Sequence, residues 1–171
     1  MSAKYQNDEV TVRQAKREDM AAVAEMIQEL ADFEKMSEGP KLSIKDLEHD
    51  CFERQPPAFL CKVVEVQGSE PRILGYAIYF PTYSTWEGRA TMLEDLYVRQ
   101  SARRRGLGER LFDAVAKEAA AQGSRLDFHV LSWNPARAFY ESKGAVNLTE
   151  TEQWCFYRLH GDSLRRLAGG A

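Results

Sequence analysis

The stretch Ser101-Ala-Arg-Arg-Arg-Gly-Leu-Gly-Glu-Arg110 decides the fold that this sequence of 171 residues predicts. It follows a strand-like run and opens an amphipathic helix. The glycines at positions 106 and 108 let the backbone approach a ligand closely, and the free N–H groups at the start of a helix point at whatever binds there. This arrangement predicts an anion site, and a pyrophosphate fits it best.

The spacing of the glycines excludes two other kinds of phosphate loop. The sequence has no Gly-x-x-x-x-Gly-Lys-Ser/Thr loop for a nucleoside triphosphate and no Gly-x-Gly-x-x-Gly loop for a dinucleotide. The pattern that remains, Arg/Gln-x-x-Gly-x-Gly/Ala at residues 103–108, resembles the acyl-CoA loop of the GNAT superfamily of N-acyltransferases. A basic turn with glycines between a strand and a helix is also common elsewhere, so the loop alone leaves that alternative open.

Length and charge predict one soluble domain over residues 1–171, with residues 1–8 as a flexible N-terminal extension. A chain of this size supports one hydrophobic core. A formal net charge of -3 gives no overall positive field, so the three consecutive arginines indicate a local site and nucleic acid is not expected as a partner. No signal peptide and no run of about 18 apolar residues is visible, so no membrane partner is expected either.

The cysteines and histidines indicate neither disulfides nor a metal site. Cys51, Cys61 and Cys155 are odd in number, far apart and without a Cys-x-x-Cys pattern, which predicts a reduced, cytoplasmic chain. The three histidines are dispersed without metal-ligand spacing. Because no His or basic residue adjoins the cysteines, a covalent acyl-enzyme is disfavoured.

The hydrophobic periodicity predicts strands and helices in a mixed order. Strands are expected at residues 9–14, 59–66, 73–83, 89–98, 125–131 and 154–159. Helices are expected around Val23 to Phe33, after a capping box of Ser43 and Asp46, from the glycine loop to Gly123, at residues 135–143 and in the tail 164–171. This order predicts an α/β fold with a mixed, mostly antiparallel central sheet flanked by helices on both faces.

Transfer of an acyl group to an amine first requires a neutral amine. A lysine-like amine has a pKa near 10.4, so at pH 7 about one molecule in two thousand is neutral, a penalty of roughly 4.6 kcal/mol. Glu94 and Asp95 lie within the expected strand 89–98, where successive side chains point to opposite faces. We expect Glu94 to attract the ammonium group and accept its proton. Charge that protects an edge strand from aggregation explains these acids equally well.

The departing thiolate of coenzyme A requires an acid, and Tyr140 is the candidate. A tyrosine is protonated at neutral pH and can donate to the sulfur. On the residues alone, a core tyrosine with a satisfied hydroxyl is the stronger interpretation. Direct attack within a ternary complex is the simplest reaction, with backbone N–H groups near Leu96 to Val98 polarising the carbonyl.

Beyond the glycine loop, the sequence resembles the diamine (spermidine/spermine) N-acetyltransferase family over nearly its whole length. The resemblance rests on the following motifs: Ile27-Gln-Glu-Leu-Ala-Asp-Phe-Glu34, Tyr83-Ser-Thr-Trp-Glu-Gly-Arg89, Leu93-Glu-Asp-Leu-Tyr-Val98, the glycine loop, Trp133-Asn134, Phe139-Tyr140, Gly144-Ala145 and Glu152-Gln-Trp154. It implies a GNAT fold, acetyl-CoA as cosubstrate without a metal, a homodimer, Tyr140 as general acid and Glu94 as the residue that contacts the amine and relays its proton.

The resemblance also implies two sets of binding residues. The expected coenzyme A positions are Leu96, Tyr97, Val98, Arg103, Arg104, Arg105, Gly106, Leu107, Gly108, Glu109, Asn134, Pro135, Ala136 and Arg137. The expected positions around the amine are Phe33, Glu34, Trp86, Glu94, Asp127, Phe128, His129, Leu131 and Glu152.

Two departures from the polyamine-specific members indicate a different acceptor. Those members carry Tyr-Asp-Pro-Trp and Val-Ala-Glu-Trp-Asn, whereas this sequence has Ser84 and Ser132 at the acidic positions and Leu131 beside the second. Losing two acids weakens the binding of a long polycation, and Leu131 suits a shorter chain with a thioether. Both segments, and the ending at residues 161–169, resemble the thialysine N-epsilon-acetyltransferase branch. Arg104 also departs, since relatives often have glycine there.

The sequence therefore predicts an acetyl-CoA-dependent amine N-acetyltransferase (EC 2.3.1 type) that prefers thialysine or another small lysine-like amine. A polyamine N-acetyltransferase is the alternative enzyme. A coenzyme A-binding or partner-binding module with little turnover is the alternative of another class.

Overall fold

A computed structural model describes residues 9–67 and 72–169, so the expected flexible extension at residues 1–8 lies outside the described part of the chain. The structure divides into two compact units, Met1–His129 and Val130–Ala171. The expectation of a single domain over the whole chain stays a prediction.

The first unit is built on one five-stranded sheet with the strands in chain order. The strands are β1 (Val10–Gln14), β2 (Leu60–Val66), β3 (Arg72–Ser84), β4 (Gly88–Val98) and β5 (Leu126–Phe128). The first four pair antiparallel, and β5 pairs parallel with β4, which confirms a mixed, mostly antiparallel sheet. The strand expected at residues 125–131 is shorter than predicted, because β5 pairs only with Thr91, Met92 and Leu93.

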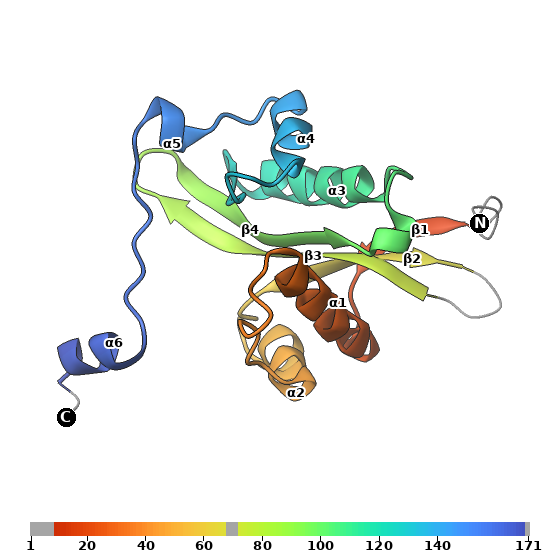
Figure 1. Cartoon of the computed structure of the whole chain (residues 1–171), viewed down its shortest axis with the longest axis horizontal. Coiled ribbons are helices and arrows are strands. Elements are labelled where there is room, and N and C mark those ends of the chain that lie inside the picture. The colour runs from red at the N-terminus through yellow and green to blue at the C-terminus, as the bar shows by residue number, and fades with distance from the viewer. Residues whose placement is uncertain (1–8, 68–71, 170–171) are drawn as a thin grey trace. The chain divides into compact units, whose positions relative to one another are not determined.

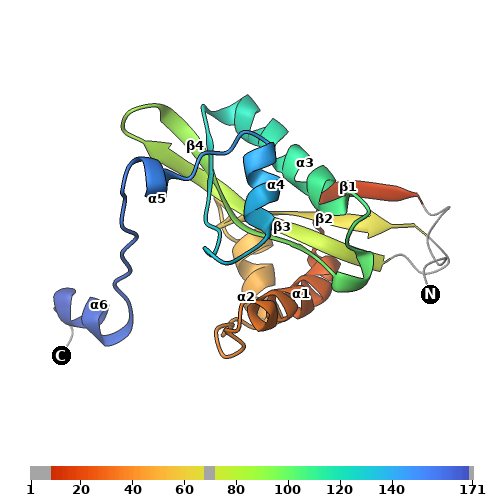
Figure 2. The ribbon, with the colours of Figure 1, turned by 45° about the horizontal axis from the view of Figure 1, so that its top comes forward.

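Helices cover both faces of this sheet, as predicted (Figure 1 and Figure 2). On one face lie α1 (Met20–Phe33), after a 3-10 turn at Arg17–Asp19, and α2 (Ile44–Glu48), which continues into a π-helical turn at His49–Glu53. On the other face lies α3 (Leu107–Gln122), after a 3-10 turn at Gln100–Ala102. The expected capping box is confirmed, since the Asp46 N–H donates to Ser43 Oγ and the Ser43 N–H donates to Asp46 Oδ2.

Neighbouring residues of β3 show how the two faces are packed. Tyr76 is fully buried in a core with Met20, Val23 and Met26 of α1. A Cβ on the preceding Gly75 would lie 3.2 Å from Leu111 Cδ1 of α3. Because successive residues of a strand point to opposite faces, each face has its own hydrophobic layer.

Helix α3 buries the apolar face that the periodicity predicts. Its buried residues are Leu107, Leu111, Phe112, Val115 and Ala119. The helix ends at Gly123 as expected. Gly123 does not have the left-handed conformation that is common after a helix, since its φ angle is -162°. A Cβ on Gly123 would lie 2.0 Å from the carbonyl oxygen of Arg89. Glycine is therefore required here by the close approach of α3's end to β4.

The second unit contains three short helices, α4 (Ala136–Ser142), α5 (Leu148–Thr151) and α6 (Gly161–Leu167). The helix expected at residues 135–143 is confirmed, with Asn134 Oδ1 accepting the Ala136 N–H at 2.9 Å. It is closed by Gly144 at a φ angle of +91°. The tail helix, α6, begins at Gly161 rather than at residue 164 as expected. Helix α5 was not predicted, although Asn147, whose side chain accepts the Thr149 N–H, is a recognisable capping residue.

The strand expected at residues 154–159 is wrong. The segment has neither helix nor strand, and its large side chains are exposed, with Phe156 at 70% and Tyr157 at 88%. Its apolar and aromatic residues favour a strand, but a strand forms only where a neighbouring strand takes its backbone hydrogen bonds. The described part of the second unit contains no strand to supply them.

Candidate active site

The glycine loop connects β4 to α3 in a conformation that matches its sequence. Gly106 is the residue before the first turn of α3 and has a left-handed φ angle of +72°. Glycine adopts this conformation without the steric cost that a Cβ brings. Arg104 is also left-handed, with a φ angle of +60°, which gives a physical reason why glycine suits that position.

The backbone at the start of α3 is open to a ligand. A Cβ on Gly106 would meet nothing within 4 Å, and one on Gly108 would meet only Val98 Cγ2, at 3.8 Å. The first N–H groups of a helix have no partner within the helix and carry partial positive charge. The residues of the loop therefore fit a diphosphate group.

Arg103 lies between two aromatic rings rather than above the start of α3. Its guanidinium carbon is 5.2 Å from the Phe33 ring centre and 5.3 Å from that of Tyr97. Its Nε donates to the Val98 carbonyl oxygen at 3.0 Å. The structure thus brings a residue expected at coenzyme A, Arg103, to one expected at the amine, Phe33, at the C-terminal end of α1.

Glu94 lies at a bulge in β4. In the pairing of β3 with β4, Ile78 is opposite Asp95 and Tyr79 is opposite Leu93, so Glu94 has no opposite residue. Its side chain is exposed, whereas Asp95 is largely shielded from solvent. Glu94 is thus the more accessible of the two acids.

Asp95 forms a polar contact inside the layer between the sheet and α1. Its Oδ2 accepts the Tyr76 hydroxyl at 3.0 Å. The pKa of Asp95 is raised to about 6: burial raises it most, the Tyr76 hydrogen bond lowers it, and the negative charges of Glu94 and Glu34 add to the rise. Burial also raises the pKa of Glu34. Three carboxyl groups, those of Glu34, Glu94 and Asp95, thus interact electrostatically where α1 ends over β4.

The second half of β4 has an open side. β4 lies between β3 and β5 and so is not the edge strand of the alternative interpretation of Glu94. Its pairing with β5, however, stops at Leu93. From residue 94 to 98, no described strand pairs with β4 on the side away from β3. Apart from the Val98 carbonyl oxygen, which accepts Arg103 Nε, the backbone groups that point to that side can meet a ligand.

Other residues expected around the amine are placed within the first unit. Trp86 lies at the tip of the β3–β4 hairpin, 82% exposed, and its N–H donates to Ser84 Oγ. Asp127 of β5 accepts from Arg125 Nε at 2.9 Å. The Phe128 ring meets Phe112 of α3 edge to face at 5.7 Å between centres, so it packs against α3, and His129 follows it.

The second unit holds the remaining predicted residues, so Tyr140 and Glu94 belong to different units. Burial raises the pKa of Tyr140 to about 12, which keeps its phenol protonated at neutral pH. Its ring meets Phe139 at 5.1 Å between centres.

The other predicted residues of the second unit make contacts within that unit. Arg137 donates to the Ser132 carbonyl oxygen and to Glu150. Glu152 Oε2 accepts the Trp154 indole N–H at 2.6 Å. Leu131 and Pro135, both before α4, complete this set.

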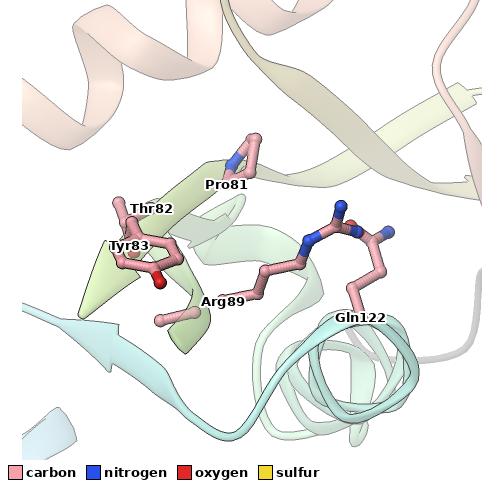
Figure 3. A pocket seen from close by; sticks show the side chains of 6 residues that line it. Pro81, Thr82, Tyr83, Arg89 and Gln122 are labelled. Atoms are coloured by element: carbon pink, nitrogen blue, oxygen red, sulfur yellow. The ribbon is translucent and has the colours of Figure 1, made fainter. Parts of the chain in front are cut away.

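One pocket of the first unit lies away from the glycine loop (Figure 3). Its volume is about 530 Å³, and it is lined by Pro81, Thr82, Tyr83, Arg89, Ala90 and Gln122. The side chains of Arg89 and Gln122 point toward one another across it. Gln122 ends α3 and the loop begins it, so at 1.5 Å per residue the two lie about 22 Å apart. None of the predicted site residues lines this pocket.

Among the described residues, no group of three or more His, Cys, Asp and Glu side chains is placed to hold a metal ion. Nor is any described helix both long and apolar enough to cross a membrane. The three cysteines are unbridged, and burial raises the pKa of Cys51 to about 11 and that of Cys61 still higher.

Comparisons with known proteins identify the family of this chain. Residues 23–145 match the acetyltransferase (GNAT) family. The thialysine N-epsilon-acetyltransferase of Bos taurus is 38% identical over 167 residues, 94% of this chain and 98% of that protein. The spermidine/spermine N(1)-acetyltransferase-like protein 1 of Homo sapiens is 31% identical over 94% of this chain but only 24% of its own length.

A solved structure shows the same fold. An integron cassette protein from V. cholerae superimposes with a TM-score of 0.70 at 24% identity, over 93% of this chain and 97% of that one. The predicted fold class is thereby confirmed. The chain belongs to the GNAT acetyltransferase family, whose members use acetyl-CoA, and it is an amine N-acetyltransferase.

Proposed function

We propose that this enzyme transfers the acetyl group of acetyl-CoA to the side-chain amine of thialysine or a similarly short, lysine-like amine. The observation that carries the proposal is the group of interacting carboxyls, Glu34, Glu94 and Asp95, at the end of α1. Carboxylates attract an ammonium group and can take its proton. The similarity to thialysine N-epsilon-acetyltransferases, 38% for the protein of Bos taurus, supports the acceptor.

The loop and the open side of β4 would hold acetyl-CoA. Backbone N–H groups around Gly106, Leu107, Gly108 and Glu109 would bind its diphosphate, with the charges of Arg104 and Arg105 nearby. The open backbone of Leu96, Tyr97 and Val98 would bind the acyl-carrying arm and polarise the thioester carbonyl. Asn134, Pro135, Ala136 and Arg137 of the second unit would complete the site. Arg103 would help to form the site by packing against the rings of Phe33 and Tyr97.

The reaction would proceed by direct attack in a ternary complex. Glu94 first accepts the proton that the ammonium group loses. The neutral amine nitrogen then forms a bond to the acetyl carbon while the carbon–sulfur bond breaks, and the Tyr140 phenol gives a proton to the departing sulfur. The second proton, which the nitrogen loses as it becomes an amide, passes through solvent and restores the phenol. These steps require both units to act as one domain. The family match over residues 23–145, which includes Glu94 and Tyr140, supports that arrangement.

A polyamine is the competing acceptor, and an acceptor panel separates the two. Values of kcat/KM are compared for thialysine, lysine and spermidine with the purified protein. We expect thialysine to give the highest value, because Ser84 and Leu131 offer no charge to a second ammonium group. A clear preference for spermidine would refute the proposed acceptor, and absence of turnover with every amine would favour a binding module.

Two substitutions test the proposed roles. Tyr140→Phe should keep the affinity for acetyl-CoA and lower kcat strongly. Turnover equal to that of the wild type would remove the phenol from the mechanism.

Glu94→Gln should raise the pH at which activity appears, because the amine must then lose its proton to solvent. An unchanged pH profile would exclude proton relay through Glu94.

We further propose a homodimer in the cytoplasm. The segment from Trp154 to Leu159 exposes large apolar side chains, which a second copy would bury. Unbridged thiols suit a reducing compartment. Sedimentation equilibrium of the protein and of a Phe156→Ser variant tests the dimer: we expect the wild type to be dimeric and the variant to dissociate at higher concentration.

A further inference from the structure

We propose that Tyr76 sets the preference for a short amine by holding Asp95 and withdrawing it from the acceptor. This inference rests on the proposed amine site and names a residue that determines its specificity. Its basis is the 3.0 Å hydrogen bond from the Tyr76 hydroxyl to Asp95 Oδ2.

The tyrosine is held firmly in place. Tyr76 has no exposed surface and belongs to the core between α1 and the sheet. Its ring packs at 6.4 Å from that of Tyr97, centre to centre. A side chain packed in this way has no room to swing its hydroxyl aside when a ligand arrives.

Asp95 belongs to the same electrostatic group as the expected amine contacts. The charges of Glu94 and Glu34 both act on its carboxyl group. Asp95 is opposite Ile78 in the sheet, and Ile78, like Tyr76, packs under α1. Asp95 therefore points to the face on which α1 ends with Phe33 and Glu34.

The number of available carboxylates distinguishes the two kinds of acceptor. The side chain of thialysine carries one ammonium group, whereas a polyamine carries several along a chain, and each gains from its own carboxylate. Asp95 is placed to serve a second ammonium group, but one of its oxygens already accepts the Tyr76 hydroxyl. That bond holds the carboxyl group toward the core, so the group can turn toward a second ammonium only by breaking the bond and leaving a buried hydroxyl without a partner. Tyr76 thus weakens the binding of a polyamine, as does Ser84, which replaces an acid of the polyamine-specific members.

The test is the ratio of kcat/KM for spermidine to kcat/KM for thialysine. Tyr76→Phe removes one oxygen atom and frees the carboxyl group, but losing that hydrogen bond also raises the pKa of Asp95. The ratio is therefore measured at about pH 8.5, where the carboxyl group is ionised, and there we expect it to rise roughly tenfold, the gain of one charge-assisted contact. The double variant Tyr76→Phe with Asp95→Asn should return to the ratio of the wild type. A general loosening of the core would lower both rates and would not depend on Asp95.

A matched control is available on the same strand. Tyr79 is 2% exposed, and its hydroxyl donates to Glu118 of α3 at 2.8 Å, on the other face of the sheet. Tyr79→Phe makes the same chemical change away from the amine and should leave the ratio unchanged. An equal rise in both variants would overturn the proposal.

A second measurement keeps the test valid if Tyr76→Phe folds poorly. Asp95→Asn retains an acceptor for the Tyr76 hydroxyl and should change the ratio by less than about twofold, since the carboxylate was already occupied. A tenfold fall would show that Asp95 already serves spermidine and would overturn the proposal. So would a Tyr76→Phe protein that folds and keeps the ratio of the wild type.

Binding measurements separate this inference from the proposed function. Calorimetry of spermidine with each folded variant needs no turnover. A protein that acetylates neither amine would refute the function, while tighter spermidine binding by Tyr76→Phe, and not by the double variant, would still support the role of Tyr76. Equal spermidine affinities in all variants would overturn that role even in an active enzyme.

Discussion

Gly108 lies beside Val98 with room for one more carbon atom between them, since a Cβ on Gly108 would stand 3.8 Å from Val98 Cγ2. This is an ordinary contact distance, so the folded chain itself does not require glycine at position 108. The remaining reason for a small residue is a ligand that approaches the backbone at the start of α3.

Substitutions of Gly108 therefore separate folding from binding. We expect Gly108→Ala to be as stable as the wild type or more stable by about 0.5 kcal/mol, because alanine favours a helix. Its affinity for acetyl-CoA should fall by less than about threefold, because the loop pattern of residues 103–108 allows alanine at this position. A long side chain, as in Gly108→Leu, should lower that affinity at least roughly tenfold, because it would keep the diphosphate from the N–H groups. Thermal melting measures the stability of both variants and calorimetry their affinity. Unchanged affinity in Gly108→Leu would mean that acetyl-CoA lies elsewhere.

Gly123 gives the opposite outcome. A Cβ at this position would lie 2.0 Å from the Arg89 carbonyl oxygen, and both atoms belong to backbone that cannot move independently. We expect Gly123→Ala to lower the free energy of unfolding by about 3 kcal/mol, as overpacking does. Urea denaturation measures this loss. A variant as stable as the wild type would show that α3 can move away from β4 at little cost.

Signals that are local in sequence predicted most of this fold. Ser43 and Asp46 form a capping box because the two partners are three residues apart. The buried face of α3 follows from helical periodicity alone. In these cases the residues that make a contact lie within two turns of one another, so the sequence contains the whole cause.

Features that depend on distant partners were missed. The segment around Phe156 has the composition of a strand, but the described unit that contains it offers no strand to pair with. Asp95 was recognised as an acid beside Glu94, yet its capture by Tyr76 depends on the register of β3 against β4 and on the bulge at Glu94. The contact between Arg103 and Phe33 joins the loop to the distant end of α1, so the loop sequence alone could not predict it.

The conformation of Arg104 predicts a stabilising substitution. At a φ angle of +60°, a residue with a Cβ is strained by about 1–2 kcal/mol, part of which glycine offsets through its greater freedom in the unfolded chain. Arg104→Gly should raise the free energy of unfolding by about 0.5–1 kcal/mol, whereas Arg104→Ala, which keeps the Cβ, should stay within about 0.5 kcal/mol of the wild type. Urea denaturation of both compares them. If Arg104→Gly and Arg104→Ala stabilised the protein equally, the cause would be charge repulsion among the three arginines instead.

The raised pKa of Asp95 predicts how stability changes with pH. In the unfolded chain its pKa is near the usual 3.8, and in the folded protein it is about 6. Between these values the folded state binds more protons than the unfolded state, so the contribution of Asp95 to stability falls as pH rises from about 4 to 6. The fall amounts to about 3 kcal/mol in all.

Asp95→Asn removes this dependence because the amide does not titrate and still accepts the Tyr76 hydroxyl. The variant should become more stable relative to the wild type as pH rises from 4 to 6, and the difference should stay constant above about pH 7. Urea denaturation of both proteins at several pH values gives the difference directly, since other titrating groups cancel. A difference that is independent of pH would mean that Asp95 is ionised throughout this range and that its carboxylate is solvated rather than buried beside Tyr76.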